Sequence, residues 1–149
     1  MSHRRLGELE RRAIDFRNSG HLEKAAELFS AIVQEQPDWE HGMGFYDLAV
    51  CSEDLGRLEL AEECYNAALR FETANPIFLG GLASFLYLHG EPEKAFSSYL
   101  RFLEVGGMGK DQKGVEIALQ VLGKKMGLSE AEVTERINKV ALRVPGRRT

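Results

Sequence analysis

Apolar residues recur along the chain at the three- and four-residue intervals of amphipathic helices. Over residues 22–35, Leu22, Ala25 and Phe29 fall on one side of a helix and charged residues occupy the other. No segment alternates with the two-residue period of a strand for long enough to form one. The pattern therefore predicts an all-α chain of eight helices, which cover residues 3–19, 22–35, 43–55, 58–72, 76–89, 92–105, 111–126 and 129–144.

Capping residues support several of these boundaries. Asn75 is a preferred N-cap residue, and Pro76 suits the first turn of the helix that follows. Ser129 and Glu132 have the spacing of a capping box at the start of the last helix. The connections are short, so consecutive helices are expected to form hairpins.

A longer period is superimposed on the helical one. A helix-breaking Gly is followed by Ala after five residues and by an aromatic residue after four more, and this pattern occurs three times. The Gly positions are separated by 36 and then 34 residues. A period near 34 residues is the signature of stacked helical hairpins. The three occurrences are Gly20, Ala25 and Phe29; Gly56, Ala61 and Tyr65; and Gly90, Ala95 and Tyr99.

These residues resemble the tetratricopeptide repeat family. Frames of 34 residues place the repeats at 6–39, 42–75 and 76–109, with the family's small residue at Ala13, Ala49 and Ala83. The resemblance implies an α-α superhelix of three hairpins in a single domain, residues 1–149. A solenoid end exposes an apolar face, so the helices over 111–144 are expected to act as a cap.

Composition narrows the classes of function. The net charge is −4, with 23 acidic and 19 basic residues, so no basic field favours nucleic acid. No apolar run approaches the roughly 20 residues that a membrane span needs. The first residues lack the hydrophobic core of a signal peptide, and we expect a cytoplasmic protein without membrane insertion.

No set of residues indicates catalysis, a metal or a cofactor. Cys51 and Cys64 lie within helical patterns and are expected to be buried, reduced thiols. The segment 106–110, Gly-Gly-Met-Gly-Lys, follows a helix and lacks the glycine spacing of a phosphate loop, so it is interpreted as a connection. We therefore expect a protein that is not an enzyme.

The resemblance implies a concave groove, lined by the first helix of each hairpin, that holds a peptide or helix of another protein. In one branch of the family, basic residues of this groove grip a C-terminal carboxylate. The matching positions here are Glu10, Ile14, Asp47, Ile77 and Gly81, and none is basic. We predict that acidic C-terminal peptides do not bind. The expected lining is Arg11, Ile14, Met43, Tyr46, Asp47, Val50, Ile77, Gly81, Ser84 and Tyr87.

The fifth helix, residues 76–89, is apolar almost all round. Packing within the repeats does not readily explain Ile77, Tyr87 and Leu88. Two interpretations stay open: the C-terminal helices cover these side chains, or they form an exposed groove awaiting a partner. In the second case Gly80 and Gly81 would leave a shallow floor where another backbone comes close.

The sequence is most consistent with a small non-catalytic adaptor that binds a protein or peptide. One alternative is a chaperone similar to those of type III secretion, although such chaperones usually have a further helix before the first repeat. Another alternative is a structural homo-oligomer, such as a homodimer, that meets its copy through the fifth helix or the edge of the first repeat.

Overall fold

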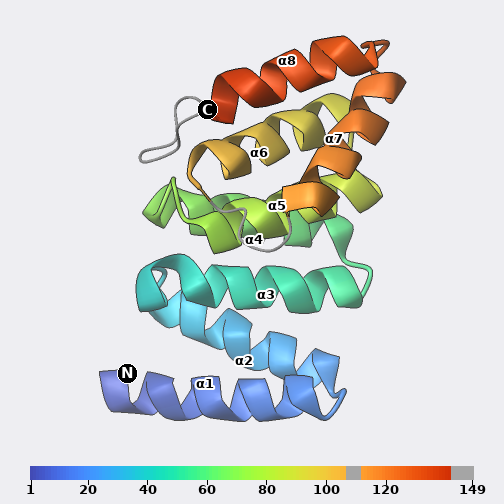
Figure 1. Ribbon diagram of the computed structural model, residues 1–149. Coiled ribbons are helices and arrows are strands. Elements are labelled where there is room, and N and C mark those ends of the chain that lie inside the picture. The colour runs from blue at the N-terminus through green and yellow to red at the C-terminus, as the bar shows by residue number, and fades with distance from the viewer. Residues whose placement is uncertain (107–111, 142–149) are drawn as a thin grey trace. The chain divides into compact units, whose positions relative to one another are not determined.

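A computed structural model describes residues 1–106 and 112–141. In these ranges the chain forms eight α-helices and one 3-10 helix, η1, and contains no strand (Figure 1). The all-α fold is confirmed, and the helix ends agree with the expected ones to within one residue, except that residues 142–144 lie outside the described ranges. The helices are α1 (His3–Asn18), α2 (Leu22–Glu35), α3 (Met43–Asp54), α4 (Leu58–Phe71), α5 (Pro76–His89), α6 (Pro92–Glu104), α7 (Gln112–Lys125) and α8 (Glu130–Ala141), with η1 at Trp39–Gly42.

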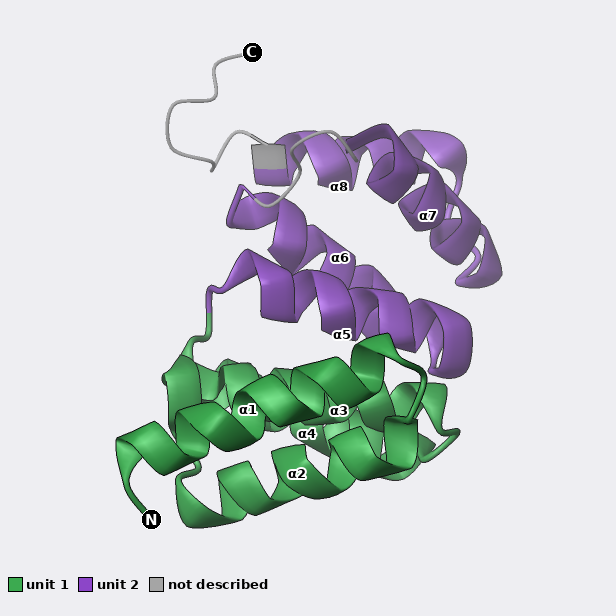
Figure 2. Ribbon diagram, turned by 90° about the horizontal axis from the view of Figure 1, so that it is seen from below, with its two compact units in different colours: residues 1–73 green, residues 74–149 purple. Residues whose placement is uncertain are grey.

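The chain divides into two compact units, residues 1–73 and 74–149 (Figure 2). The first contains α1 to α4 with η1, and the second contains α5 to α8. The expected single domain stays a prediction.

In the first unit, each helix packs against the next in sequence, from α1 to α4. The alanines at the repeat positions, such as Ala13, Ala25 and Ala49, have no exposed surface. Because a methyl side chain lets two helices approach closely, these positions determine how tightly each hairpin closes. The repeat aromatics Phe29 and Tyr65 are also buried and fill the space beside the alanines.

An insertion separates the first two repeats of this unit. Residues 40 and 41 lie between the frames 6–39 and 42–75 and account for the 36-residue spacing. Glu40 and His41 both adopt left-handed backbone conformations, with φ of 50° and 55°, and Gly42 follows with φ of 104°. Left-handed residues other than Gly cost roughly 1–2 kcal/mol each. The adjacent Trp39, which is buried and packs beside Gly44, holds this turn in place.

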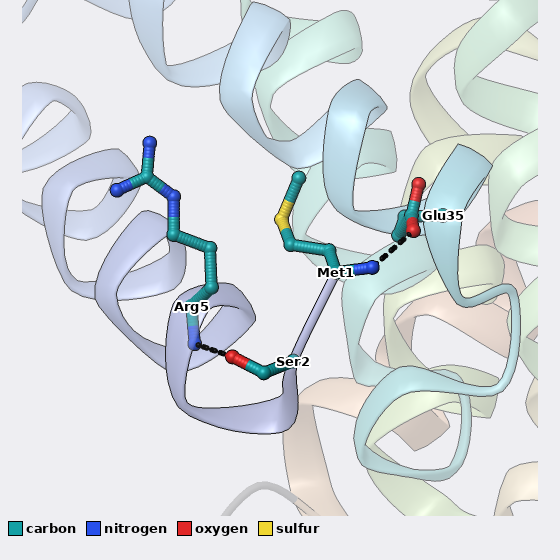
Figure 3. Close-up of polar contacts among 4 residues, drawn as sticks. All are labelled: Met1, Ser2, Arg5 and Glu35. Carbon is teal, nitrogen blue, oxygen red and sulfur yellow. Dashed lines mark hydrogen bonds and ion pairs between the residues drawn. The ribbon is translucent and has the colours of Figure 1, made fainter.

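The beginning of α1 is fixed by two polar contacts (Figure 3). The Ser2 hydroxyl accepts a hydrogen bond from the Arg5 backbone N–H at 3.2 Å and thereby caps the helix. The Met1 amino group donates to the Glu35 carboxylate at 2.7 Å. Glu35 is the last residue of α2, so this ion pair joins the open ends of the first hairpin.

In the second unit, α5 packs on α6, and both α7 and α8 pack on α6 and on each other. Ala83 and Ala95 are fully buried between α5 and α6. Gly123 of α7 meets the side chain of Val133 of α8, since an added Cβ at Gly123 would collide with it. The second unit therefore has a continuous core, from the repeat alanines to the last helix.

Both predicted caps of the second unit are confirmed. The Asn75 side chain accepts hydrogen bonds from the N–H groups of Ile77 and Phe78, at 2.9 and 3.3 Å. The Ser129 hydroxyl accepts from the Glu132 N–H at 3.1 Å, and the Glu132 carboxylate accepts from the Ser129 N–H at 3.2 Å. The expected connection at 107–110, and Leu142 and Val144 of the expected last helix, lie outside the described residues.

Candidate binding surface

All ten residues expected to line a groove lie on α1, α3 and α5, the first helices of their hairpins. On α3, four of them follow the spacing of one helical side, and all four are half-buried while the opposite side is buried. This side of α3, formed by Met43, Tyr46, Asp47 and Val50, is called the α3 face.

An ion pair crosses from α1 to the α3 face. The Arg17 guanidinium donates to the Asp47 carboxylate at 3.1 Å, with side-chain exposures of 29% and 13%. The guanidinium also lies 5.8 Å from the centroid of the Phe29 ring. Neighbouring groups thus partly shield both charges from water. The Arg17 guanidinium is already paired with Asp47 before any ligand binds.

Burial has the largest effect on the pKa of the Asp47 carboxyl. Loss of hydration raises the pKa of its carboxyl above the usual value, and the opposing effect of Arg17, by charge and by hydrogen bond, is smaller. Glu10 adds a repulsive contribution in the same direction as burial. The α3 face is therefore a poor place for a further negative charge.

Two tyrosines connect the α3 face to α4. The rings of Tyr46 and Tyr65 meet edge to face with centroids 5.8 Å apart. The Tyr65 hydroxyl donates to the Glu53 carboxylate at 2.8 Å. Burial raises the pKa of Tyr46, and the nearby charges of Asp47 and Glu53 raise it further. The phenol of Tyr46 therefore stays neutral at physiological pH and presents an apolar ring with a polar tip.

The two lining residues expected on α1, Arg11 and Ile14, differ in exposure. Arg11 is exposed and makes no ion pair with any residue in the described ranges, while Ile14 is half-buried. Glu10, a neighbouring position, accepts a hydrogen bond from the indole N–H of Trp39 at 2.7 Å. Of the two expected lining residues on α1, Arg11 is therefore the one with a charge available to a ligand.

The open side of α5 differs from the α3 face. Ile77 is 54% exposed and Leu88 is 64% exposed, and the positions between them on this side are Gly81 and Ser84. Within the second unit, α7 and α8 leave these apolar side chains uncovered. The partly buried Tyr87 has its ring 6.4 Å from that of Tyr99. Contact with the Tyr99 ring of α6 thus covers part of Tyr87, which stays partly exposed, and the most open apolar side chains on this side are Ile77 and Leu88.

The two adjacent glycines of α5 have different surroundings. A Cβ at Gly80 would lie 3.2 Å from the Phe102 ring of α6, so Gly80 makes room for packing inside the hairpin. Gly81 lies one residue further round the helix, on the open side. Gly80 is therefore not part of the expected shallow floor, which stays a prediction at Gly81.

The remaining chemistry is sparse. Cys51 and Cys64 are buried free thiols, as expected, and burial raises the pKa of each to about 11. Residues 1–106 and 112–141 contain no group of three His, Cys, Asp or Glu side chains that could hold a metal ion. No helix in those ranges is long and apolar enough to cross a membrane.

The fold and its open first helices define a helical-hairpin repeat protein with a surface suited to binding another polypeptide. A family model described as tetratricopeptide repeat matches residues 10–76 and 54–106. The chain therefore belongs to the tetratricopeptide repeat family. A search of curated proteins gives no match.

Solved structures share this fold at low sequence identity. The Yersinia enterocolitica type III secretion chaperone SycD, in complex with a peptide of the translocator YopD, is 22% identical, with a TM-score of 0.75 over 84% of this chain and 97% of that one. SycD in an alternative dimer is also 22% identical, with a TM-score of 0.73 over 85% and 98%. The MamA protein is 14% identical, with a TM-score of 0.75 over 93% and 72%.

Sequence reasoning missed the polar contacts that hold the α3 face. Asp47 was an expected lining residue, but its partner Arg17 is 30 residues away in the sequence. The Trp39 indole and the Tyr65 hydroxyl had no predicted acceptor. The 36-residue spacing was the available signal for an unusual turn before α3, since a 34-residue repeat has no place for two further residues.

Proposed function

We propose that this chain is a non-catalytic binding protein that holds a peptide or helix of another protein against the open faces of its first helices. On the first unit, the lining is Arg11 and Ile14 of α1 with the α3 face. On the second unit, it is Ile77, Gly81, Ser84 and Tyr87 of α5. The observation that carries the proposal is that the chain's own packing leaves these apolar and aromatic positions partly or fully open.

The chemistry of the lining indicates the kind of ligand. Tyr46, Val50 and Ile77 offer apolar and aromatic surface, which favours a segment with exposed apolar side chains. Asp47 is partly desolvated and Arg17 is already paired, so a carboxylate gains little here. SycD, which has a similar fold, is seen with a translocator peptide, and this supports a peptide as the ligand class.

Selection from a library of random dodecapeptides provides a ligand with which to test the proposal. Tyr46→Ala and Tyr87→Ala should each weaken binding of the selected peptide by about 2 kcal/mol, roughly 30-fold in Kd, if the rings are anchors. Fluorescence anisotropy measures the change. Leu60→Ala on α4 is the control, because Leu60 is 39% exposed and lies outside the proposed lining. Unchanged affinity in both tyrosine variants would refute the proposal that the peptide binds to this lining.

The same assay tests the expected selectivity. A pentapeptide with a free, acidic C-terminus should show no binding at micromolar concentrations, because none of the positions that match the family's carboxylate-binding residues is basic. Amidation of that terminus should not reduce any residual binding. Micromolar affinity that depends on the free carboxylate would contradict this prediction.

A second candidate function is a chaperone for a secreted apolar protein. Similarity to SycD favours it, although an identity of 22% supports the fold alone. Coexpression distinguishes the two functions. A chaperone should keep an apolar, aggregation-prone segment soluble in a stable complex of defined stoichiometry, whereas an adaptor binds its peptide reversibly without changing that segment's solubility.

A further inference from the structure

The open side of α5 is a narrow stripe of four residues. At 100° per residue, Ile77, Gly81, Ser84 and Leu88 fall within about 60° of one another around the helix. Leu88 is the most exposed large apolar side chain in the described residues. The stripe carries no charge and no neighbouring helix of the second unit covers it, so it can meet another apolar surface. We call these four residues the α5 stripe.

Along the helix, the side chains of the α5 stripe are large, small, small and large, so their order is the same from either end. Two large residues, Ile77 and Leu88, lie about 16 Å apart along the helix, and two small ones, Gly81 and Ser84, lie about 4.5 Å apart between them. The midpoint of both pairs is the same. If two copies of α5 cross antiparallel, Ile77 of one meets Leu88 of the other, and the small residues face each other at the crossing. Small residues at a crossing allow the helix axes to come close, and a two-fold axis requires such a self-complementary surface.

The charge distribution disfavours another symmetric contact between copies. Residues 1–73 contain 8 Lys and Arg but 15 Asp and Glu, a net charge of −7, whereas residues 74–149 contain 11 and 8, a net charge of +3. Two copies that meet through residues 1–73 bring strongly like charges together. The α5 stripe brings no ionisable side chain into the contact, and the unit that carries it has the smaller net charge.

We propose that two copies of this chain associate through antiparallel contact of their α5 stripes, and that this contact competes with ligand binding. The competition rests on the proposed function, because Ile77, Gly81 and Ser84 belong to both contacts. A stable interface buries about 1,200–2,000 Å² with about 20–30 residues a side, and one four-residue stripe supplies much less. The dimer is therefore weak and reversible, and a ligand in excess displaces it. By thermodynamic linkage, the factor by which ligand binding weakens dimerisation equals the factor by which dimerisation weakens ligand binding.

Sedimentation equilibrium over a concentration series of the full chain tests the dimer. The native chain should show a concentration-dependent dimer. Leu88→Glu should raise its dissociation constant about 100-fold, because each copy loses an anchor worth about tenfold and places a charge in an apolar contact. Leu60→Glu is the matched control and should dimerise like the native chain. A native chain that stays monomeric at millimolar concentration, or equal dimerisation of the Leu88→Glu variant, would overturn the proposal.

Cross-linking tests the antiparallel geometry. A variant with both Ile77→Cys and Leu88→Cys should form a disulfide between two copies, because the two positions are too far apart to bridge within one helix. The native Cys51 and Cys64 are buried and do not interfere. The cross-linked dimer should not bind the selected dodecapeptide, and reduction should restore binding. Absence of the cross-link would exclude this crossing, and peptide binding by the cross-linked dimer would exclude competition.

Two variants separate this inference from the proposed function. Leu88 is outside the proposed ligand lining, so Leu88→Glu should lose the dimer and retain affinity for the dodecapeptide. Tyr46→Ala should lose peptide affinity and retain the dimer. A monomer that binds peptide through Tyr46 and Tyr87 would refute the dimer alone, whereas a dimer whose peptide affinity is unaffected by both tyrosines would refute the proposed function alone.

Discussion

The α3 face and the α5 stripe occupy first helices of successive repeats, yet they differ in chemistry. On α3, Asp47 pairs with Arg17, and Tyr46 contacts the ring of Tyr65, whose hydroxyl donates to Glu53. The α5 stripe has no ionisable side chain. The repeat alanines are nevertheless buried in both repeats, at Ala49 and Ala61 and at Ala83 and Ala95, so similar hairpin packing supports two different surfaces. The repeat aromatics differ, since Tyr65 is buried and Tyr99 is only partly buried.

This difference shows that a repeat fold uses buried positions for stability and open positions for recognition. The buried positions of each repeat contact neighbouring helices, and their size is therefore constrained. The open positions contact water, so charge and size can change there without disturbing the hairpin. A polar, pre-paired surface favours orientation and selectivity, while an uncharged apolar one favours affinity with little selectivity. Substitutions at buried and open positions test that division.

Trp39→Ala should destabilise the first unit by about 3–5 kcal/mol. The side chain is 2% exposed, so its loss leaves a large cavity and removes the donor to Glu10. Urea unfolding followed by far-UV circular dichroism measures the change, because Trp39 is the single tryptophan and its fluorescence is lost. Trp39→Phe is the control and should cost clearly less. A loss below 1 kcal/mol for the alanine variant would show that the turn before α3 is held by other contacts.

Arg17→Ala should destabilise the first unit by about 2 kcal/mol, because it leaves the partly buried Asp47 carboxylate without its cation. Urea unfolding followed by Trp39 fluorescence reports this change. Arg57→Ala is the matched control: its pair with Glu23 is as short, at 2.8 Å, but exposed, and should contribute less than about 1 kcal/mol. Equal effects in the two variants would mean that burial of the Arg17–Asp47 pair is unimportant.

Two glycines of α7 should respond in opposite directions to replacement by Ala. Gly123→Ala should destabilise the second unit by about 1–2 kcal/mol, because the new methyl group collides with Val133. Gly114→Ala should stabilise it by up to about 1 kcal/mol, since the added Cβ would meet no other element of the described residues within 4 Å and Ala favours the helix. Thermal unfolding by circular dichroism compares the pair. Changes of the same sign would contradict the separation of buried and open positions.

The smallest effect expected is a pH dependence from Asp47. Its folded-state pKa is raised, so between the unfolded and folded values the native protein binds more protons than the unfolded chain. The contribution of Asp47 to stability is therefore present at low pH and is lost as the pH rises through the folded pKa. The free energy of unfolding of the native chain minus that of Asp47→Asn should fall from pH 3 toward neutrality. A rise over this range would show that Arg17 outweighs burial.

Local features of this protein were determined by its sequence. Asn75 and the Ser129–Glu132 pair cap the predicted helices because a cap involves residues at most three positions apart. The repeated alanines are buried because their spacing places them on the packed sides of successive helices. The sequence also indicated that packing within the repeats does not explain Ile77 and Leu88, but it left open whether the C-terminal helices cover them.

Only the tertiary structure decided the contacts between distant residues. Arg17 meets Asp47, and Trp39 meets Glu10, because the packed helices bring together side chains about 30 positions apart. Gly80 lies against the Phe102 ring of α6, and the left-handed residues Glu40 and His41 follow the buried Trp39. A sequence pattern records which side of a helix is apolar. It does not record the distances between helices, and those distances determine which polar groups pair.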